Sequence, residues 1–251
     1  MIKLKSILKE IDLGEVPFSD PDAFDDPDGF SQFIAKWNYV EEPNTEDEAA
    51  FISDLKSYIE EPNIHTHQSA HIASVLKQLL PLKTKFPGIL DPASYTKTVD
   101  RGTTISIKTF IDSASKFEGD DLVFNTKVKL SSKGNKKFLS FSADYFTAEN
   151  FVDQQTSADE RKGEFIAAGL IPVVIAINAS NPNLIFNSNI TKFFNDWGGD
   201  EKETFYVGDS LTTDQIILPV SVLHWVKRGL REVPKEYQEA YNKLKSLYNI
   251  S

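Results

Sequence analysis

From Thr98-Val-Asp-Arg-Gly-Thr-Thr-Ile-Ser-Ile-Lys108 onward, apolar and polar residues begin to alternate along the chain. Alternation with a period of two places successive side chains on opposite faces of a β-strand. Further short segments rich in β-branched and aromatic residues follow, separated by Gly, Asn and Asp. We therefore expect strands at residues 104–108, 122–130, 137–141, 171–177, 204–207 and 215–218.

Upstream of Thr98, apolar residues recur at helical spacing instead. Three such runs predict helices at residues 30–37, 46–60 and 68–80. We interpret their aromatic residues as core that covers one face of the sheet: Phe30, Phe33, Trp37, Phe51 and Tyr58. Two later helices are expected at residues 147–154 and 235–248, and the second has an apolar face that should dock on the core.

Helices followed by strands, without strict alternation, predict an α+β fold with a mixed or antiparallel β core and an N-terminal helical layer. The length of 251 residues permits one or two domains. We expect an acidic N-terminal arm at residues 1–28, whose Pro and Asp cluster should form neither helix nor strand. A single domain should then cover residues 29–251, with a helical part at 29–90, a strand-rich core at 91–220 and a C-terminal helix at 235–248.

Composition and charge exclude several classes of protein. With 40% hydrophobic and 25% charged residues, the chain has the composition of a soluble globular protein. The formal net charge of −10 repels a phosphate backbone, so direct nucleic-acid binding is not expected. The most apolar stretch, residues 165–177, is too short to cross a bilayer and no signal peptide is recognisable, so we expect a cytoplasmic protein.

The sequence contains no recognisable metal- or nucleotide-binding motif. The chain has no cysteine, which excludes disulfides, thiolate nucleophiles and Cys-containing zinc sites. His65, His67 and His71 have no carboxylate among them, so we expect no metal site there. Neither a P-loop nor a Gly-x-Gly-x-x-Gly motif is present. Lysines at 127, 129, 133, 136 and 137 predict a basic hairpin around residues 134–135, interpreted as a solvated face, with attraction of an anionic cofactor left open.

Three separated motifs lie in the strand-rich part. They are Asp100-Arg101-Gly102-Thr103, Phe138-Leu139-Ser140-Phe141-Ser142 and Glu201-Lys202-Glu203-Thr204-Phe205. Each is common alone, but in this order and on predicted strands they resemble the Arg-Ser-Glu class of mono-ADP-ribosyltransferases. That class includes the enzymes of clostridial binary toxins and enzymes encoded by tailed bacteriophages. The resemblance covers roughly residues 90–220; Asp100 stands where the family often has an aromatic residue, and Phe141 where it has Thr.

The resemblance implies an ADP-ribosyltransferase-like fold with NAD as the donor and no metal. Glu203 would stabilise the positive charge that develops on the ribose carbon as nicotinamide leaves, and Ser140 would orient Glu203. Arg101 would bind the diphosphate through its fork of N–H donors. Glu201 would address the acceptor by orienting it and taking up its proton, and a Glu at this position predicts that the acceptor is a protein arginine. The implied cofactor-binding set is Arg101, Gly102, Ser140, Ser142, Phe146, Phe151 and Glu203, with Phe146 or Phe151 stacking on nicotinamide.

The implied reaction is transfer of ADP-ribose to a protein side chain, in a bacterial host if the chain is phage-encoded. Two alternatives stay open at this point. One is an NAD glycohydrolase, which passes the sugar to water. The other is a non-catalytic interaction protein of the same fold, associated with a virion. The sequence leaves the target protein, the source and the oligomeric state open.

Overall fold

The computed structural model describes residues 27–59, 75–131, 138–156, 167–186, 202–213, 215–222 and 233–249. Their centre is an eight-stranded sheet with the strand order β2-β3-β10-β6-β1-β5-β8-β7. A separate two-stranded sheet pairs β4 with β9. Each recorded strand pair is antiparallel, so the α+β prediction is confirmed at that level.

The strands are short except for two at the middle of the large sheet. Their bounds are β1 (Thr98–Ser106), β2 (Ser115–Glu118), β3 (Asp121–Phe124), β4 (Val128–Ser131), β5 (Phe138–Ser142), β6 (Leu170–Asn178), β7 (Leu184–Phe186), β8 (Glu203–Val207), β9 (Ser210–Thr213) and β10 (Gln215–Leu218). Strand β6 lies between β1 and β10, which explains why its residues 171–177 are all buried and apolar. A strand with neighbours on both edges and covered faces needs no polar side chains.

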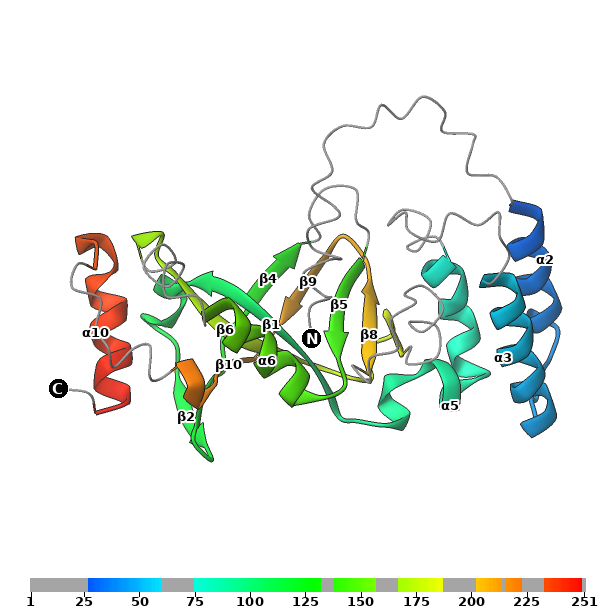
Figure 1. The fold of residues 1–251 in the computed structure, drawn as a ribbon, viewed down its shortest axis with the longest axis horizontal. Helices are drawn as coiled ribbons and strands as arrows, with labels where there is room; N and C mark the ends of the chain where they lie inside the picture. Colours follow the sequence, from blue (N-terminus) through cyan, green and yellow to red (C-terminus); the bar gives the residue numbers. More distant parts are fainter. Residues whose placement is uncertain are drawn as a thin grey trace, which may run out of the picture.

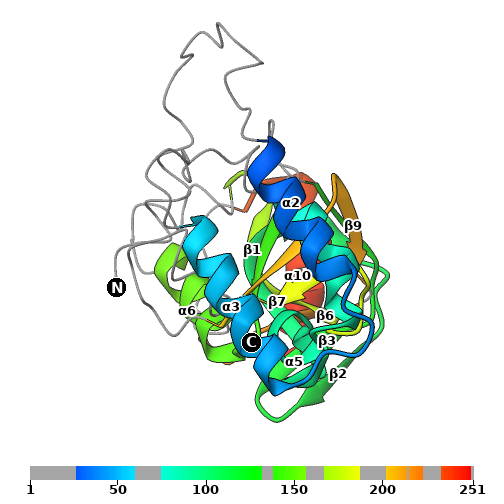
Figure 2. The same ribbon diagram turned by 90° about the vertical axis from the view of Figure 1, so that its right-hand side faces the viewer.

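Most helices gather at the two ends of the sheet, whereas α6 (Tyr145–Thr156) lies over its middle (Figure 1). Beyond β7 and β8 lie α2 (Pro27–Asn38), α3 (Thr45–Ile59), the helical residues 75–79, η2 (Leu80–Thr84), α5 (Pro87–Leu90) and η3 (Pro92–Ser94). Figure 2 shows α2 and α3 in front of the sheet when the molecule is viewed from that end. At the opposite end, α10 (Gln238–Leu247) follows η5 (Lys235–Tyr237).

An aromatic cluster joins the N-terminal helices to the sheet. The rings of Phe51 and Phe86 stack at 4.3 Å, and Trp37 meets each of them edge-on. This cluster packs against Ile185 of β7 and Phe205 of β8. The predicted core residues Phe33, Trp37 and Phe51 are therefore confirmed as buried, whereas the side chains of Phe30 and Tyr58 lie outside the described part.

Helix α3 begins where its sequence can cap it. The Asn44 Oδ1 atom accepts hydrogen bonds from the backbone N–H groups of Glu46 and Asp47, at 2.9 and 3.1 Å. The Asp47 carboxylate accepts a hydrogen bond from the Asn44 N–H at 3.1 Å. These bonds satisfy amides that lack partners at a helix start.

The C-terminal helix docks on the core as predicted. Ala240, Tyr241 and Leu244 of α10 are buried against residues of η4 (Ile107–Phe110) and the sheet. The Lys243 ammonium donates to the backbone carbonyls of Ile111 and Ser113, which fastens α10 to the turn after η4. Apolar contact and a specific polar anchor thus act together at this end of the molecule.

Several predicted boundaries were wrong. The strand expected at 122–130 is two strands, β3 and β4, in different sheets, since Asn125 and the two residues after it interrupt the pattern. The strand expected at 104–108 runs over Thr98–Ser106, because nine register pairs with β6 extend it through Gly102 and Ile107 then enters η4. Helix α6 (Tyr145–Thr156) begins two residues earlier than expected.

The basic hairpin was also wrong, because β4 pairs with β9 whereas β5 pairs with β1 and β8. Residues 132–137, with three of its lysines, lie outside the described part. The expected acidic arm, residues 1–28, overlaps the first two residues of α2, which begins at Pro27. Proline is tolerated in the first helical turn, where its missing N–H would have no partner anyway. The C-terminal helix matches its expected bounds closely, as η5 followed by α10.

The large sheet opens between β1 and β5. In the described residues these neighbouring strands share a single register pair, Asp100↔Ser142, whereas β1 makes nine with β6 and β5 makes five with β8. We call this place the seam. It divides the sheet into a part formed by β2, β3, β10, β6 and β1 and a part formed by β5, β8 and β7.

Within the described ranges, no helix has both the length and the apolarity needed to span a bilayer.

Candidate functional site

Three of the side chains singled out in the sequence meet at the seam. Arg101 comes from β1, Ser140 from β5 and Glu203 is the first residue of β8. The Ser140 hydroxyl donates a short hydrogen bond to Glu203 Oε1. The Arg101 Nη1 atom donates to the backbone carbonyl of Ser140 at 2.6 Å. Residues 39 and 63 positions apart in the chain are therefore in direct contact.

The position of Glu203 is fixed by its strand and by the backbone before it. Its Cα pairs with that of Ser142, and the next residues of β8 continue the register to Phe138↔Val207. Lys202 precedes it with φ of 44°, in the left-handed region that non-glycine residues rarely adopt. The Lys202 carbonyl accepts a hydrogen bond from the Ala143 N–H at 2.9 Å. The start of β8 is thereby tied to the turn that follows β5.

Charge and burial act together on Arg101 and Glu203. Glu203 is only 5% exposed. Burial lowers the pKa of Arg101, and the Glu203 carboxylate opposes that effect by favouring the charged guanidinium. A guanidinium remains protonated at ordinary pH even when its pKa falls. The pair therefore offers a fixed positive charge beside a fixed, oriented carboxylate.

Ser142 and Asp144 organise the start of α6 next to this pair. The buried Ser142 hydroxyl oxygen accepts a hydrogen bond from the Asp144 N–H at 2.9 Å. Asp144 in turn accepts the Phe146 N–H at 3.2 Å and so caps α6. Ser142 therefore lies at the site, but its recorded bond is to the turn after β5.

Gly102 has a structural explanation of its own. A Cβ atom at this position would lie 2.4 Å from the Ala148 carbonyl oxygen and 2.8 Å from the Phe151 Cβ, both in α6. Side-chain atoms essentially never come that close to backbone. The absence of a side chain thus lets α6 cross β1 closely.

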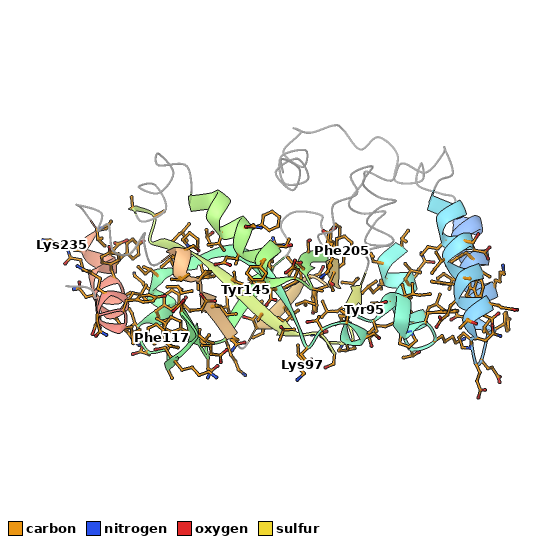
Figure 3. All side chains as sticks on the ribbon, turned by 60° about the horizontal axis from the view of Figure 1, so that its bottom comes forward. Tyr95, Lys97, Phe117, Tyr145, Phe205 and Lys235 are labelled. Atoms are coloured by element: carbon orange, nitrogen blue, oxygen red, sulfur yellow. The ribbon has the colours of Figure 1, made fainter. Side chains whose placement is uncertain are left out.

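The two aromatic candidates for nicotinamide stacking, Phe146 and Phe151, differ in their exposure to solvent. Phe146, in the first turn of α6, is 70% exposed and meets only the neighbouring Tyr145 edge-on among the recorded ring contacts. Phe151 is half-buried, one helical turn or more along α6, close to Gly102. Figure 3 labels Tyr145 near the middle of the molecule and Phe205 of β8 toward its helical end. Phe146 is the more open of the two candidates.

Glu201 lies outside the described residues, as do His65, His67 and His71. Glu201, two residues before Glu203, would share a face with it only if the strand already extended to residue 201. Strand β8 begins at Glu203, and the φ of Lys202 departs from an extended backbone. The role of Glu201 therefore stays a prediction from the sequence resemblance.

Sequence reasoning missed two groups beside the site. Asp100 is only 5% exposed, and its pKa is raised from 3.8 to about 7, first by burial and then by Asp144. The Tyr145 hydroxyl donates to Asp121 at 2.6 Å, and burial together with nearby carboxylates raises its pKa further. An acidic residue at the entry to a predicted strand was the available signal for Asp100. Its neighbours became visible only through the strand register.

The geometry brings together a group that can hold an anion and a group that can stabilise developing positive charge. A guanidinium can hold phosphates, and a carboxylate held by a serine can stabilise positive charge. In the described part of the chain, no group of three His, Asp or Glu side chains is placed to hold a metal ion. The chain matches no protein-family model, no curated protein and no solved structure among those compared.

Proposed function

We propose that this chain is an NAD-dependent mono-ADP-ribosyltransferase with the fold of that family, acting on a protein side chain, with arginine as the first choice. The observation behind the proposal is the convergence of Arg101, Ser140 and Glu203 from three separate strands. These residues were selected from the order of motifs alone. Their contacts were not implied by any local sequence feature.

The carboxylate has a direct part in the proposed reaction. Breaking the bond between nicotinamide and ribose develops positive charge at the ribose carbon. A carboxylate in a buried, water-poor position stabilises such charge far better than one in water. Glu203 is buried and is held by the Ser140 hydroxyl, so it needs little rearrangement when the charge appears.

Arg101 is proposed to hold the diphosphate of NAD. Guanidinium offers five N–H donors in a planar fork, and the recorded bond to the Ser140 carbonyl uses one of them. Paired N–H donors match two phosphate oxygens in one plane. The same bond to Ser140 keeps the guanidinium at the seam, next to the serine that orients Glu203.

The acceptor is proposed from the Glu201 prediction. An arginine guanidinium needs a carboxylate to orient it before it can attack the ribose carbon. With Glu203 engaged by the ribose, Glu201 is assigned to that orientation. A protein of formal charge −10 also suits a basic, arginine-bearing partner in a bacterial cytoplasm.

The test uses NAD labelled on its adenylate and a bacterial lysate. The purified chain should release nicotinamide and label protein. Glu203→Gln keeps the shape of the side chain but removes its charge, so both activities should fall by roughly 100-fold or more, which corresponds to about 3 kcal/mol of barrier. Glu118→Gln is the matched control, because Glu118 lies in β2 at the far edge of the sheet.

Each other outcome points to a different function. Nicotinamide release without labelled protein would indicate an NAD glycohydrolase. Absence of release by the unmodified chain would favour a non-catalytic interaction protein, such as one carried in a virion. Release that survives Glu203→Gln at the level of the control would contradict the assigned role of this residue.

A further inference from the structure

Asp100 is a buried acid that the roles assigned above do not use. Buried carboxyl groups are normally hydrogen-bonded or paired with a cation. In the described part of the chain, no hydrogen bond or ion pair is recorded for the Asp100 side chain, although it is 5% exposed. Keeping such a group is costly for the fold, so it is a candidate for a functional role.

The strand register places Asp100 in line with Glu203. Asp100 pairs with Ser142 across the seam, and Ser142 pairs with Glu203. Residues directly opposite each other in antiparallel strands have side chains on the same face. Asp100, Ser142 and Glu203 therefore form one row on one face of the sheet, about 10 Å long for two strand spacings of about 4.8 Å.

Ionisable side chains from β1, β8 and the start of α6 lie near Asp100, Ser142 and Glu203. Asp144, which caps α6, raises the pKa of Asp100, and burial is the larger cause. Tyr145 and Glu149 belong to α6, and Asp100 contributes to the raised pKa of Tyr145. Arg101 follows Asp100 in β1, and Glu203 lies one strand beyond Ser142. The exposed Phe146 marks the solvent-facing rim at the start of α6.

Resting on the proposed function, we propose that Asp100 is the base that takes the proton of the attacking nucleophile. In this step the bond from the ribose C1′ to the pyridinium nitrogen breaks, and its electron pair stays on nicotinamide. A lone pair of the acceptor nitrogen forms the new bond to C1′. The proton lost by that nitrogen moves to the Asp100 carboxylate, which becomes a carboxylic acid.

Spacing and acidity both suit this role. Two carboxyl groups about 6.5 to 9.5 Å apart leave room for a nucleophile between them when one stabilises the sugar and the other accepts a proton. Two strand spacings of about 4.8 Å separate the backbones of Asp100 and Glu203 by about 10 Å, just beyond the upper end of that range before side-chain reach is counted. A general base works best when its pKa is near the working pH, and that of Asp100 is about 7. Glu201 would then orient the acceptor without receiving its proton.

The deciding measurement is the pH dependence of turnover at saturating NAD, between pH 5.5 and 9. For the unmodified chain, the rate should rise up to about tenfold per pH unit below pH 7 and level off above it. Asp100→Asn should lower the rate at pH 8 by roughly 100-fold and remove this rise, with NAD affinity changed less than about twofold. Glu201→Gln should lower transfer but keep the rise.

The possible outcomes separate the two hypotheses. An active chain whose Asp100→Asn variant keeps its rate and its pH dependence overturns the role of Asp100 and leaves the proposed function standing. A chain that neither binds NAD nor releases nicotinamide overturns both. If Asp100→Asn does not fold, Asp100→Ala with added formate replaces it, because removal of the carboxyl group leaves space for a small base. Recovery of turnover with formate supports the role, and a folded variant without recovery contradicts it.

Discussion

At the scale of single residues, the two buried carboxyl groups of the site differ in their surroundings. Glu203 is hydrogen-bonded, whereas burial disfavours the charged form of Asp100. The Glu203 carboxyl group accepts a hydrogen bond from the Ser140 hydroxyl, and its charge acts on the Arg101 guanidinium. Asp100 is equally buried, and the structure records no such help for it among the described residues. Selection for folding alone would remove such a carboxyl, since polar networks that are only partly satisfied destabilise a core.

This difference predicts how stability depends on pH. The folded pKa of Asp100 is raised from 3.8 to about 7, so between these values the native state binds more protons than the unfolded state. The free energy of unfolding therefore falls as pH rises through that window. Asp100→Asn removes this loss and should raise the melting temperature at pH 8, by an amount equivalent to roughly 4 kcal/mol at most, but not near pH 4.

Calorimetry or circular dichroism at pH 4 and pH 8 measures the change in melting temperature. Asp112→Asn is the control, because Asp112 is exposed. Equal stabilisation at pH 4 and pH 8 would contradict the explanation from ionisation. Together with the expected loss of turnover, a more stable and less active variant would be a trade of stability for function at one residue.

A second prediction at this scale concerns Arg101. Arg101→Lys keeps a positive charge but loses the planar fork and the geometry of the bond to the Ser140 carbonyl. We expect NAD affinity to fall by roughly tenfold or more, about 1.4 kcal/mol, in a folded protein. Isothermal calorimetry gives the affinity, and an unchanged dissociation constant in a folded variant would refute the contact with the diphosphate.

At the scale of elements, the packing of α6 on β1 depends on a glycine. Gly102→Ala would place a methyl group 2.4 Å from the Ala148 carbonyl oxygen, so α6 must move away from β1. Overpacking of this kind costs about 1 to 3 kcal/mol. Gly88→Ala is the matched control, because a methyl group there meets nothing within 4 Å and alanine favours a helix such as α5.

Urea unfolding of both variants measures the difference in stability. Gly102→Ala should be clearly less stable than the control, and its turnover should fall because α6 starts at the residues that border the site. A Gly102→Ala variant as stable as Gly88→Ala would mean that the helix adjusts without cost, which would remove the packing explanation for this glycine.

Elements with a strong local signal were predictable from the sequence. Helices α2, α3, α6 and α10 and strands β6, β8 and β10 appear close to their expected places, because apolar periodicity determines them. Strands β2, β7 and β9 were missed, since they are three or four residues long and depend on partners far away in the chain. For the same reason β4 was assigned to the wrong partner.

The candidate site divides in the same manner. Arg101, Ser140 and Glu203 could be selected because their motifs follow a recognisable order. Asp100 and Asp144 could not, because their importance depends on burial and on the register across the seam. A sequence contains that register only indirectly, through the way in which all strands pack at once.

At the scale of the whole molecule, two of the core clusters in the described residues lie on either side of the site. One contains α10, η4 and the strands up to β1, and the other joins the N-terminal helices to β7 and β8. A third cluster crosses the seam, where Val99 and Ile177 pack with Leu139, Phe141 and Tyr206. The elongated arrangement in Figure 1 follows the strand order from β2 to β7, with helices at both ends. The candidate site lies between these cores, where residues from both parts of the sheet meet.

Because β1 and β5 share a single register pair, the two parts of the sheet should differ in the free energy at which their amides open to hydrogen exchange. A ladder interrupted at one place transmits cooperativity poorly, which leaves the side-chain cluster across the seam as the main link between the two parts of the sheet. We expect this link to be weaker than a continuous ladder, so that the two parts open as separate units. Under native conditions, amide hydrogen exchange should give one opening free energy for β1, β6 and β10 and a different one for β5 and β8. NAD, bound to residues of both parts, should bring the two values together, whereas a single value without NAD would show that the sheet opens as one unit.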